Sequence, residues 1–395
     1  MSCVVNWIGR GRSSTGSSGR VDAEVELESD LPLESFSEES DVLGTDRLAE
    51  SLAPLLLLRK PESLVLAIEG SWGAGKTTLA NVLENRVRAP DRRPKPAIVK
   101  FGAWLFSERG ALLADFFREL QSSVGFHEGK LDDAVRRLME FGLMFTAKSR
   151  TPKLFAPDEA RQVWRVKQRV AAALRRCNRR ILVFVDDIDR LTKSETRLLF
   201  WLLKTVADLP SIYYILMYDR DVVVRALNGY FPGRGEEYLA RIVQVRVPLP
   251  LPTRETVKGF LARLLSRVAG VPEANAVAII CPVWQAGLDS LVPTLRHAKL
   301  LANALGVGQK FGHDICAPCV AAESLRVFIP SAYTYVRQNL ETFLTNPSTH
   351  IPYGDIRVPL SKAAVAEQLL NIIFPPRVAG KALDATAVHK YFYVG

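Results

Sequence analysis

Residues 70–78 read Gly-Ser-Trp-Gly-Ala-Gly-Lys-Thr-Thr and match the pattern G-x-x-x-x-G-K-[ST]. The apolar run Leu64–Glu69, bounded by Pro61 and Gly70, precedes this motif and is typical of a strand buried on both faces of a parallel sheet. A helix is predicted to start near Gly75 and to run through Arg86. A strand, a glycine-rich loop and a helix in this order predict an α/β fold with a phosphate-binding loop.

The loop offers two kinds of contact to a nucleotide. Its glycines let backbone N–H groups turn toward phosphate oxygens, and the following helix adds the partial positive charge of its N-terminus. We expect Lys76 to reach the β- and γ-phosphates of ATP and the Thr77 hydroxyl to bind Mg²⁺. The alternative, a glycine-rich turn without a ligand, is disfavoured by the flanking strand and helix. The predicted phosphate-binding residues are Gly70, Ser71, Trp72, Gly73, Ala74, Gly75, Lys76, Thr77 and Thr78.

A second apolar run, Ile181–Val185, ends in Asp186 and Asp187. In open α/β sheets ligands bind at the carboxyl ends of the strands, so both carboxylates are expected beside the loop. We assign Asp186 to the water shell of Mg²⁺ and Asp187 to polarising the attacking water. An exchange of these two roles, or an acidic loop without a catalytic role, remains open. Asp189 and Arg190 are interpreted as an internal ion pair or a helix cap.

Three further residues are candidates for contacts with the γ-phosphate. The run Ile212–Tyr218 is predicted to form the next strand. Asp219 at its end is either a catalytic carboxylate or the N-cap of a helix beginning at Asp221. Arg241 and Arg296 could add positive charge to the transition state, but their spacing in the sequence places neither of them in the site.

Strand and helix patterns alternate up to residue 252 and the strand pattern then stops. Further strands are predicted at Ala97–Phe101 and Gln244–Val247, with helices at 111–124, 160–176, 195–207 and 222–227. Periodic segments at 254–268, 288–305, 318–328 and 332–344 predict helices only. The predicted architecture is an α/β parallel sheet sandwiched by helices over 41–252, with a helical insertion at about 107–180 between the nucleotide motifs and a C-terminal all-helical domain over 253–395.

Charge is unevenly distributed along the chain. The net charge is +10, yet residues 1–46 carry three arginines against ten acidic residues. Residues 1–40 combine Ser, Gly and acids without a sustained apolar face, so we interpret them as a disordered tail; the alternative is an acidic segment that masks the basic body. The basic remainder attracts nucleic acid, anionic lipid or acidic protein, and charge alone does not choose among these partners.

Hydropathy and cysteine content bear on the compartment. No apolar run approaches the ~18–20 residues of a membrane span, so no span is predicted and the cytoplasm is the expected location. Five scattered cysteines predict reduced thiols rather than a disulfide framework. His313, Cys316 and Cys319 have a spacing found in zinc sites, but a second cysteine pair is missing. Packing of the two cysteines on a helix face is therefore the preferred interpretation.

Taken together, the motifs resemble those of the KAP family of P-loop NTPases, a branch with an extra strand between the phosphate-loop strand and the acidic strand. The resemblance rests on the phosphate loop and on Asp41–Gly44, Phe101–Trp104, Asp186–Arg190, Tyr214–Asp219, Tyr238–Gln244, Pro293–Arg296 and Leu325–Phe328. It implies ATP hydrolysis coupled to a conformational switch or to assembly, with Arg296 similar in position to a second-sensor arginine. Many relatives carry membrane helices between the nucleotide motifs, where this chain has arginine-rich amphipathic segments, so the resemblance implies a soluble, bacterial-type member. Some bacterial relatives are linked to phage exclusion.

The leading prediction is Mg²⁺-dependent ATP hydrolysis that drives a conformational switch or assembly with a protein partner, with phage defence as the implied setting. Two alternatives are kept, a nucleotide-gated scaffold with negligible hydrolysis and a P-loop kinase. The kinase is disfavoured because paired acids at the end of a central strand suit water activation. The predicted catalytic residues are Lys76, Asp187, Asp219 and Arg296, and the predicted metal ligands are Thr77 and Asp186.

Overall fold

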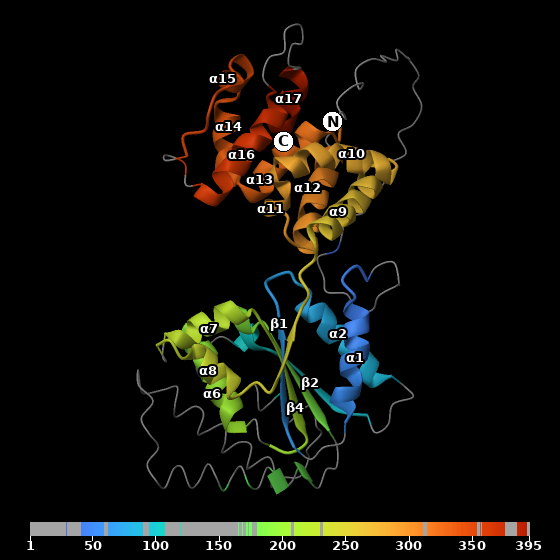
Figure 1. Ribbon diagram of the computed structural model, residues 1–395, viewed down its shortest axis with the longest axis vertical. Helices are drawn as coiled ribbons and strands as arrows, with labels where there is room; N and C mark the ends of the chain where they lie inside the picture. Colours follow the sequence, from blue (N-terminus) through green and yellow to red (C-terminus); the bar gives the residue numbers. More distant parts are fainter. Residues whose placement is uncertain are drawn as a thin grey trace.

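The computed structural model has an α/β region followed along the chain by a helical region (Figure 1). It describes residues 41–58, 62–89, 95–106, 180–206, 209–229, 232–310, 314–353, 358–375 and 385–392, together with isolated positions between these ranges and residue 29. Apart from such positions, the predicted tail over 1–40 and the predicted insertion over 107–180 lie outside the described residues. The helices predicted at 111–124 and 160–176 fall there as well.

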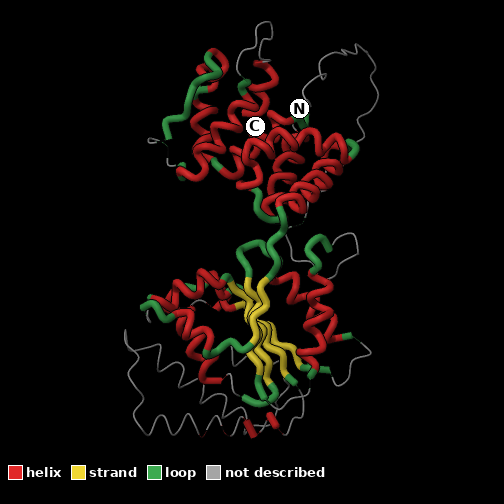
Figure 2. Tube along the Cα trace, viewed as in Figure 1, coloured by secondary structure: helices red, strands yellow, loops and turns green. Residues whose placement is uncertain are grey.

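Five strands form one parallel sheet in the order β2-β3-β4-β1-β5 (Figure 2). They are β1 Leu64–Glu69, β2 Ala97–Gly102, β3 Ile181–Asp186, β4 Ile212–Tyr218 and β5 Val245–Pro248. The register pairs Glu69 with Tyr218 and Val185 with Leu216, so the carboxyl ends of β1, β4 and β3 meet at one edge of the sheet. Because β4 lies between β1 and β3, the extra strand that the resemblance implies is present.

Helices cover both faces of the sheet, which confirms the predicted sandwich. The covering helices are α1 Thr45–Leu57, α2 Lys76–Arg88, α6 Lys193–Val206, α7 Arg220–Asn228 and α8 Gly235–Ala240. Leu66 and Ile68 of β1 share a buried cluster with residues of α1 and α2. The alternate residues Val65 and Ala67 share another cluster with residues of α6, α7 and α8. With both faces buried, β1 is apolar at nearly every position rather than at every second one.

The helical region has a core of its own, separate from the two clusters of the sheet. Its elements are α9 Arg254–Ala269, α10 Glu273–Val283, the π-helical turn η3 Trp284–Leu288, α11 Asp289–Leu291, α12 Leu295–Lys310, α13 Ala317–Phe328, α14 Pro330–Gln338, α15 Leu340–Thr345, α16 Leu360–Ile373 and α17 Ala385–Phe392. Among the described residues no strand follows β5. Within the same residues no single helix is both long and apolar enough to cross a membrane, whereas α9 with the Glu273–Leu291 segment meets both criteria only as a pair bent by 120°.

Two helices predicted as continuous are interrupted in the structure. The segment 288–305 breaks at Pro293, because a residue that precedes proline is pushed out of the helical region, and Val292 accordingly has φ −119° and ψ 64°. The segment 332–344 breaks at Asn339, whose φ and ψ are −115° and 25°. The first break precedes the start of α12 at Leu295, and the second separates α14 from α15.

The core around β1 predicts a clear stability difference. Leu66→Ala is expected to lower the free energy of unfolding by about 2–5 kcal/mol, because it removes a side chain that is 1% exposed. Leu251→Ala is the matched control, since Leu251 is 70% exposed, and it should change stability by no more than about 0.5 kcal/mol. Chemical denaturation followed by circular dichroism measures both values, and equal losses would remove Leu66 from the core.

Candidate active site

The loop between β1 and α2 keeps its shape through glycines in a conformation that other residues adopt poorly. Gly73 and Gly75 have φ angles of 80° and 93°, in the left-handed region. The Ala74 amide donates to the Ser71 carbonyl at 3.1 Å, which tightens the turn before α2 begins at Lys76. The chain thus passes from the end of a strand directly into a helix N-terminus, the arrangement that favours phosphate groups.

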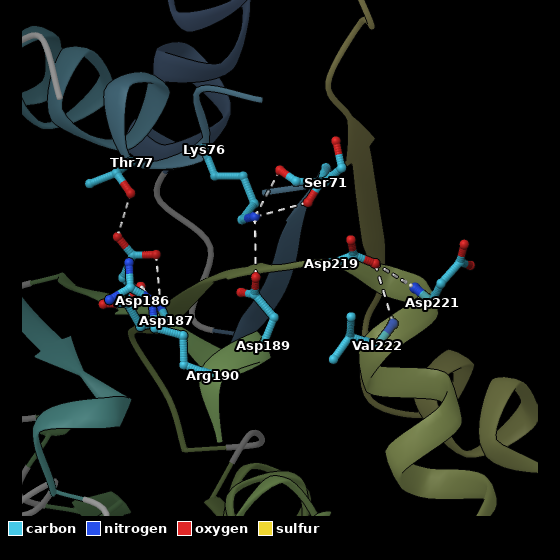
Figure 3. A network of polar contacts seen from close by, with 11 residues as sticks. Ser71, Lys76, Thr77, Asp186, Asp187, Asp189, Arg190, Asp219, Asp221 and Val222 are labelled. Carbon is cyan, nitrogen blue, oxygen red and sulfur yellow. Dashed lines mark hydrogen bonds and ion pairs between the residues drawn. The ribbon is translucent and has the colours of Figure 1, made fainter. Parts of the chain in front are cut away.

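The ammonium group of Lys76 is held at the loop. Its Nζ donates to the carbonyls of Gly70 at 2.9 Å and Ser71 at 3.2 Å (Figure 3). Asp189 forms an ion pair with the same nitrogen at 3.6 Å, and both side chains are largely buried. Carbonyl oxygens and a carboxylate therefore satisfy a charge that ATP phosphates could satisfy instead.

Thr77 and Asp186, the two predicted metal ligands, lie within hydrogen-bond distance of each other. The Thr77 hydroxyl donates to Asp186 Oδ2 at 2.7 Å, and Asp186 Oδ1 accepts the Asp187 amide at 2.8 Å (Figure 3). A hydroxyl and a carboxylate are hard oxygen ligands of the kind that Mg²⁺ takes alongside water and substrate phosphates. The donor set therefore fits Mg²⁺ at the start of α2. Thr78, the last residue of the motif, lies half-buried in the same helical turn.

Asp187 is engaged by a different partner. It has a left-handed backbone (φ 59°, ψ 29°) and precedes the short 3-10 turn Ile188–Arg190. Its Oδ1 pairs with Arg190 Nε at 2.9 Å, and the Arg190 guanidinium lies over the Trp104 ring at 5.6 Å. Desolvation raises the pKa of Asp187 above its ordinary value, and the negative charge of Asp186 adds to this rise. The sequence suggested an ion pair for Asp189 and Arg190. In the structure each of them pairs with a different residue: Asp189 with Lys76, and Arg190 with Asp187.

Asp219 caps a helix. Its Oδ1 accepts the backbone N–H groups of Asp221 at 3.0 Å and Val222 at 3.3 Å, at the start of α7 (Figure 3). The helix begins at Arg220, one residue earlier than predicted. Asp219 follows β4, so it stands at the same sheet edge as Gly70 and Asp186 while it serves as the N-cap.

The helical region meets the loop through α12. The Arg296 guanidinium lies 3.9 Å from the centroid of the Trp72 ring, and His297 meets the same ring edge-on at 6.3 Å. A Cβ placed on Gly73 would lie 3.2 Å from the Arg296 side chain and 3.3 Å from Thr294 Oγ1, so only glycine fits there without movement. Arg296 is therefore at the phosphate loop in this structure.

The other arginine candidate has a different place. Arg241 is the exposed C-cap residue of α8, and its backbone N–H donates to the Tyr238 and Leu239 carbonyls. These backbone hydrogen bonds of Arg241 lie at the end of α8.

A buried polar network behind the loop is absent from the sequence predictions. Glu69, the last residue of β1, is 9% exposed and accepts the Tyr218 hydroxyl at 3.2 Å. Arg246 Nε lies 3.9 Å from the same carboxylate, and its Nη1 bonds Glu236 of α8 at 2.6 Å. Burial and the charge of Glu69 raise the pKa of Tyr218, which keeps its hydroxyl protonated as a donor. A glutamate at the end of an apolar strand is the one sequence signal that could have indicated this network.

These features define a P-loop NTPase in which an extra strand separates the phosphate-loop strand from the acidic strand. Residues 45–310 match the KAP family P-loop domain, which is well over half of the chain. The chain belongs to the KAP family.

One curated relative is the phage T7 exclusion protein of Escherichia coli strain K12. It is 26% identical over 250 residues, which cover 54% of this chain and 34% of the relative. The chain thus spans about a third of the length of that protein.

Solved structures with similar chains include Orc1 of Aeropyrum pernix in complex with DNA, at 15% identity and a TM-score of 0.42, with 91% of this chain and 93% of the other covered. Orc2 of Aeropyrum pernix has 13% identity and a TM-score of 0.44, with 92% and 86% covered. A RuvB variant of Thermotoga maritima has 14% identity and a TM-score of 0.36, with 86% and 91% covered.

The position of Lys76 predicts its effect on nucleotide binding. Lys76→Ala should weaken binding of Mg·ATP by about tenfold to a hundredfold, the loss expected when a charge-assisted hydrogen bond of about 1.5–3 kcal/mol is removed. Lys100→Ala is the control, since Lys100 is an exposed lysine on β2 that pairs with Glu84 of α2, away from the loop. Calorimetric titration of both variants measures the affinities, and an unchanged value for Lys76→Ala would exclude this lysine from phosphate binding.

Proposed function

We propose that this protein is an Mg²⁺-dependent ATPase that couples hydrolysis to a conformational switch or to assembly with a protein partner. The observation that carries the proposal is the 2.7 Å hydrogen bond between Thr77 and Asp186 beside the phosphate loop. Family membership supports nucleotide binding, and the relative named a phage T7 exclusion protein supports phage defence as the setting. The basic body of the chain supports an acidic partner surface, with nucleic acid as one candidate.

Each part of the loop has a task in this proposal. Lys76 leaves the loop carbonyls and Asp189 to bind the β- and γ-phosphates, and the loop amides surround the phosphate oxygens. Thr77 and Asp186 would hold Mg²⁺, and a bound Mg²⁺ would supply positive charge next to the phosphates. The glycines at 73 and 75 permit the backbone conformation that aims these amides.

Water activation is the step for which the chain offers more than one carboxylate. Asp187 follows the metal ligand directly, and its raised pKa brings it closer to that of a general base at neutral pH. Its ion pair with Arg190 has to open before it can act on water. Asp189 already faces the loop through Lys76, which makes it the second candidate. We keep Asp187 as the proposed base, with Asp219 positioned at the edge of the same site.

The contact between Arg296 and Trp72 supports a role for the helical region in sensing nucleotide. Arg296 lies on the ring of a loop residue, so a bound γ-phosphate near the loop would compete with that ring for the guanidinium. Movement of Arg296 from the ring to the phosphate would shift α12 relative to the sheet. This is the proposed link between hydrolysis and a change of domain position.

The rival function is a nucleotide-gated scaffold with negligible hydrolysis. The ion pair between Asp187 and Arg190 favours it, because the arginine engages one carboxylate oxygen and lowers the basicity of the group. Release of phosphate from ATP, measured with and without candidate protein partners, DNA or RNA, separates the two. Turnover at any of these conditions supports the ATPase, whereas tight ATP binding without turnover supports the scaffold. Transfer of phosphate to an added small acceptor would instead indicate a P-loop kinase.

Substitutions of the two acids test which of them serves the water. Asp187→Asn should reduce the hydrolysis rate by about a hundredfold or more while ATP affinity is retained, because the amide cannot take a proton. Asp189→Asn, the matched control, should bind ATP more tightly, since it removes a negative charge next to Lys76. Single-turnover phosphate release and calorimetry measure the two effects. The opposite pattern would transfer the role to Asp189, and equal rates in Asp187→Asn and the parent would transfer it to Asp186 or Asp219.

The pH profile gives an independent readout. The carboxylate form of Asp187 is the active one, and burial with the neighbouring charge of Asp186 raises its pKa. As the pH falls, hydrolysis should therefore be lost at a higher pH than it would be if the base were an exposed aspartate. The residual rate of Asp187→Asn should lack this acid limb.

Arg296→Ala should weaken ATP binding more than ADP binding, by about tenfold in the ratio of the two affinities, since only ATP offers the γ-phosphate. Arg263→Ala is the control, because Arg263 lies on α9 over its neighbour Phe260. Competition titrations with a non-hydrolysable ATP analogue and with ADP measure the ratio. A ratio equal to that of the parent would leave Arg296 as a structural contact between α12 and the phosphate loop, without a role in sensing the γ-phosphate.

A further inference from the structure

The helical region contains a dithiol pair at the start of α13, in the order Cys-Ala-Pro-Cys. Cys316 is the N-cap residue, with an extended backbone at φ −136° and ψ 168°. Cys319 lies three residues on, in the first turn, where its sulfur interacts with the backbone N–H of Cys316. In an α-helical turn, Cα atoms three residues apart are about 5 Å from each other, and a disulfide needs Cα atoms within about 4.4–6.8 Å of each other. The Cα spacing at the start of α13 is thus one that a disulfide can span.

The two thiols have different surroundings. Cys316 is partly exposed, and its Sγ lies 3.1 Å from the Tyr391 hydroxyl on α17. Cys319 is 2% exposed, and burial raises its pKa well above the ordinary value. An outer thiol that small molecules can reach, followed after two residues by an inner protected thiol, is the arrangement used for thiol–disulfide exchange.

The zinc-type spacing considered from the sequence involves the same two cysteines. Among the residues that the structure describes, no three or more His, Cys, Asp or Glu side chains gather as metal ligands. His313, which completes the spacing considered from the sequence, lies outside the described residues.

The packing of α17 connects the pair to the core of the helical region. The Tyr391 carbonyl accepts the Tyr333 hydroxyl at 3.2 Å, and Phe392 stacks on the Tyr333 ring at 5.2 Å between centroids. Phe392 also stacks on Phe374, the C-cap residue of α16, at 6.1 Å. The contact from Cys316 to Tyr391 is therefore part of the interface along which α17 lies against α13, α14 and the end of α16.

We propose that Cys316 and Cys319 are a redox-modification site, which small disulfides such as oxidised glutathione convert reversibly into an intramolecular disulfide. In the first step the Cys316 thiol attacks one glutathione sulfur, the S–S bond of the reagent breaks, and one reduced glutathione leaves with the proton. In the second step the Cys319 sulfur attacks Cys316 Sγ, and the second glutathione leaves as a thiol with the proton of Cys319. Two protein thiols are oxidised and one glutathione disulfide is reduced, so the step balances.

Oxidation also changes the contact with α17. The disulfide has no S–H group to donate, and forming it turns the Cys316 sulfur toward Cys319, so we expect the 3.1 Å contact with the Tyr391 hydroxyl to lengthen. Amide exchange in residues 385–392 should accordingly be faster in the oxidised than in the reduced protein. This site is independent of the nucleotide site, and its test does not use ATP.

The test uses the full chain, incubated with oxidised glutathione, alkylated and analysed by peptide mass spectrometry. In the parent protein the 316–319 peptide should lose two hydrogens, and reduction should restore them. Cys281 is the internal control, because it is a partly exposed cysteine on α10 whose sulfur lies 3.8 Å from Gln285. The pair should be oxidised at least roughly tenfold more than Cys281 at one reagent concentration, because its second thiol acts at an intramolecular effective concentration.

Two variants distinguish the roles of the thiols. Cys319→Ser should accumulate a stable glutathione adduct on Cys316, since the resolving thiol is gone, whereas Cys316→Ser should leave Cys319 no more modified than Cys281. The parent measurement needs no substitution, so it decides the matter even if a variant fails to fold. A persistent glutathione adduct on Cys316 of the parent, or oxidation of the pair no greater than that of Cys281, would overturn the proposal.

Discussion

The hydrogen bond between Thr77 and Asp186 is the contact on which the geometry of the site depends. It joins the start of α2 to the end of β3, although β4 lies between β3 and β1. Neighbouring strands are about 4.8 Å apart, so β1 and β3 are separated by roughly 10 Å and the loop has to lean across the end of β4. The Gly70 amide donates to the Tyr218 carbonyl at 3.1 Å, which fixes the first residue of the loop on the last residue of β4. The end of the central strand β4 thus positions the loop. The buried hydrogen bond from the Tyr218 hydroxyl to Glu69 holds the ends of β4 and β1 together.

The sheet could be predicted from the sequence because its strands are buried on both faces. Leu64–Glu69 and Ile212–Tyr218 have the bounds that their apolar runs predict, and β5 begins one residue later than expected, at Val245. The helical region was predicted less well, because its breaks depend on single residues. Asn339 splits one helix by its backbone conformation, which no period of apolar residues reveals. Helix α16, Leu360–Ile373, was not predicted, although its buried residues Ala366, Leu369, Leu370 and Ile373 recur at helical spacing.

In the site, too, the residues of local motifs could be predicted from the sequence, whereas the contacts between distant residues could not. Lys76, Thr77 and Asp186 are recognisable because their spacing to a strand end has a chemical reason. The pairing of Lys76 with Asp189, and that of Asp187 with Arg190, depends on how a short turn with a left-handed residue directs its side chains. Its sequence shows only alternating acids and an arginine. The place of Arg296 on Trp72 depends on the packing of two regions whose contact is not encoded in spacing.

The two cations nearest to the phosphate loop, Lys76 and Arg296, both rest on groups that a nucleotide could replace. Lys76 lies against loop carbonyls and Asp189, and Arg296 lies against an aromatic ring. A cation on a ring contributes about 0.5–2 kcal/mol, whereas a charge-assisted hydrogen bond contributes about 1.5–3 kcal/mol, so phosphate is the better partner for Arg296. This difference in free energy is small, so Arg296 would return to Trp72 once the γ-phosphate is removed. If ATP binding uses Arg296 as proposed, a partner that moves the helical region away from the loop weakens ATP binding, and ATP weakens the binding of that partner by the same factor.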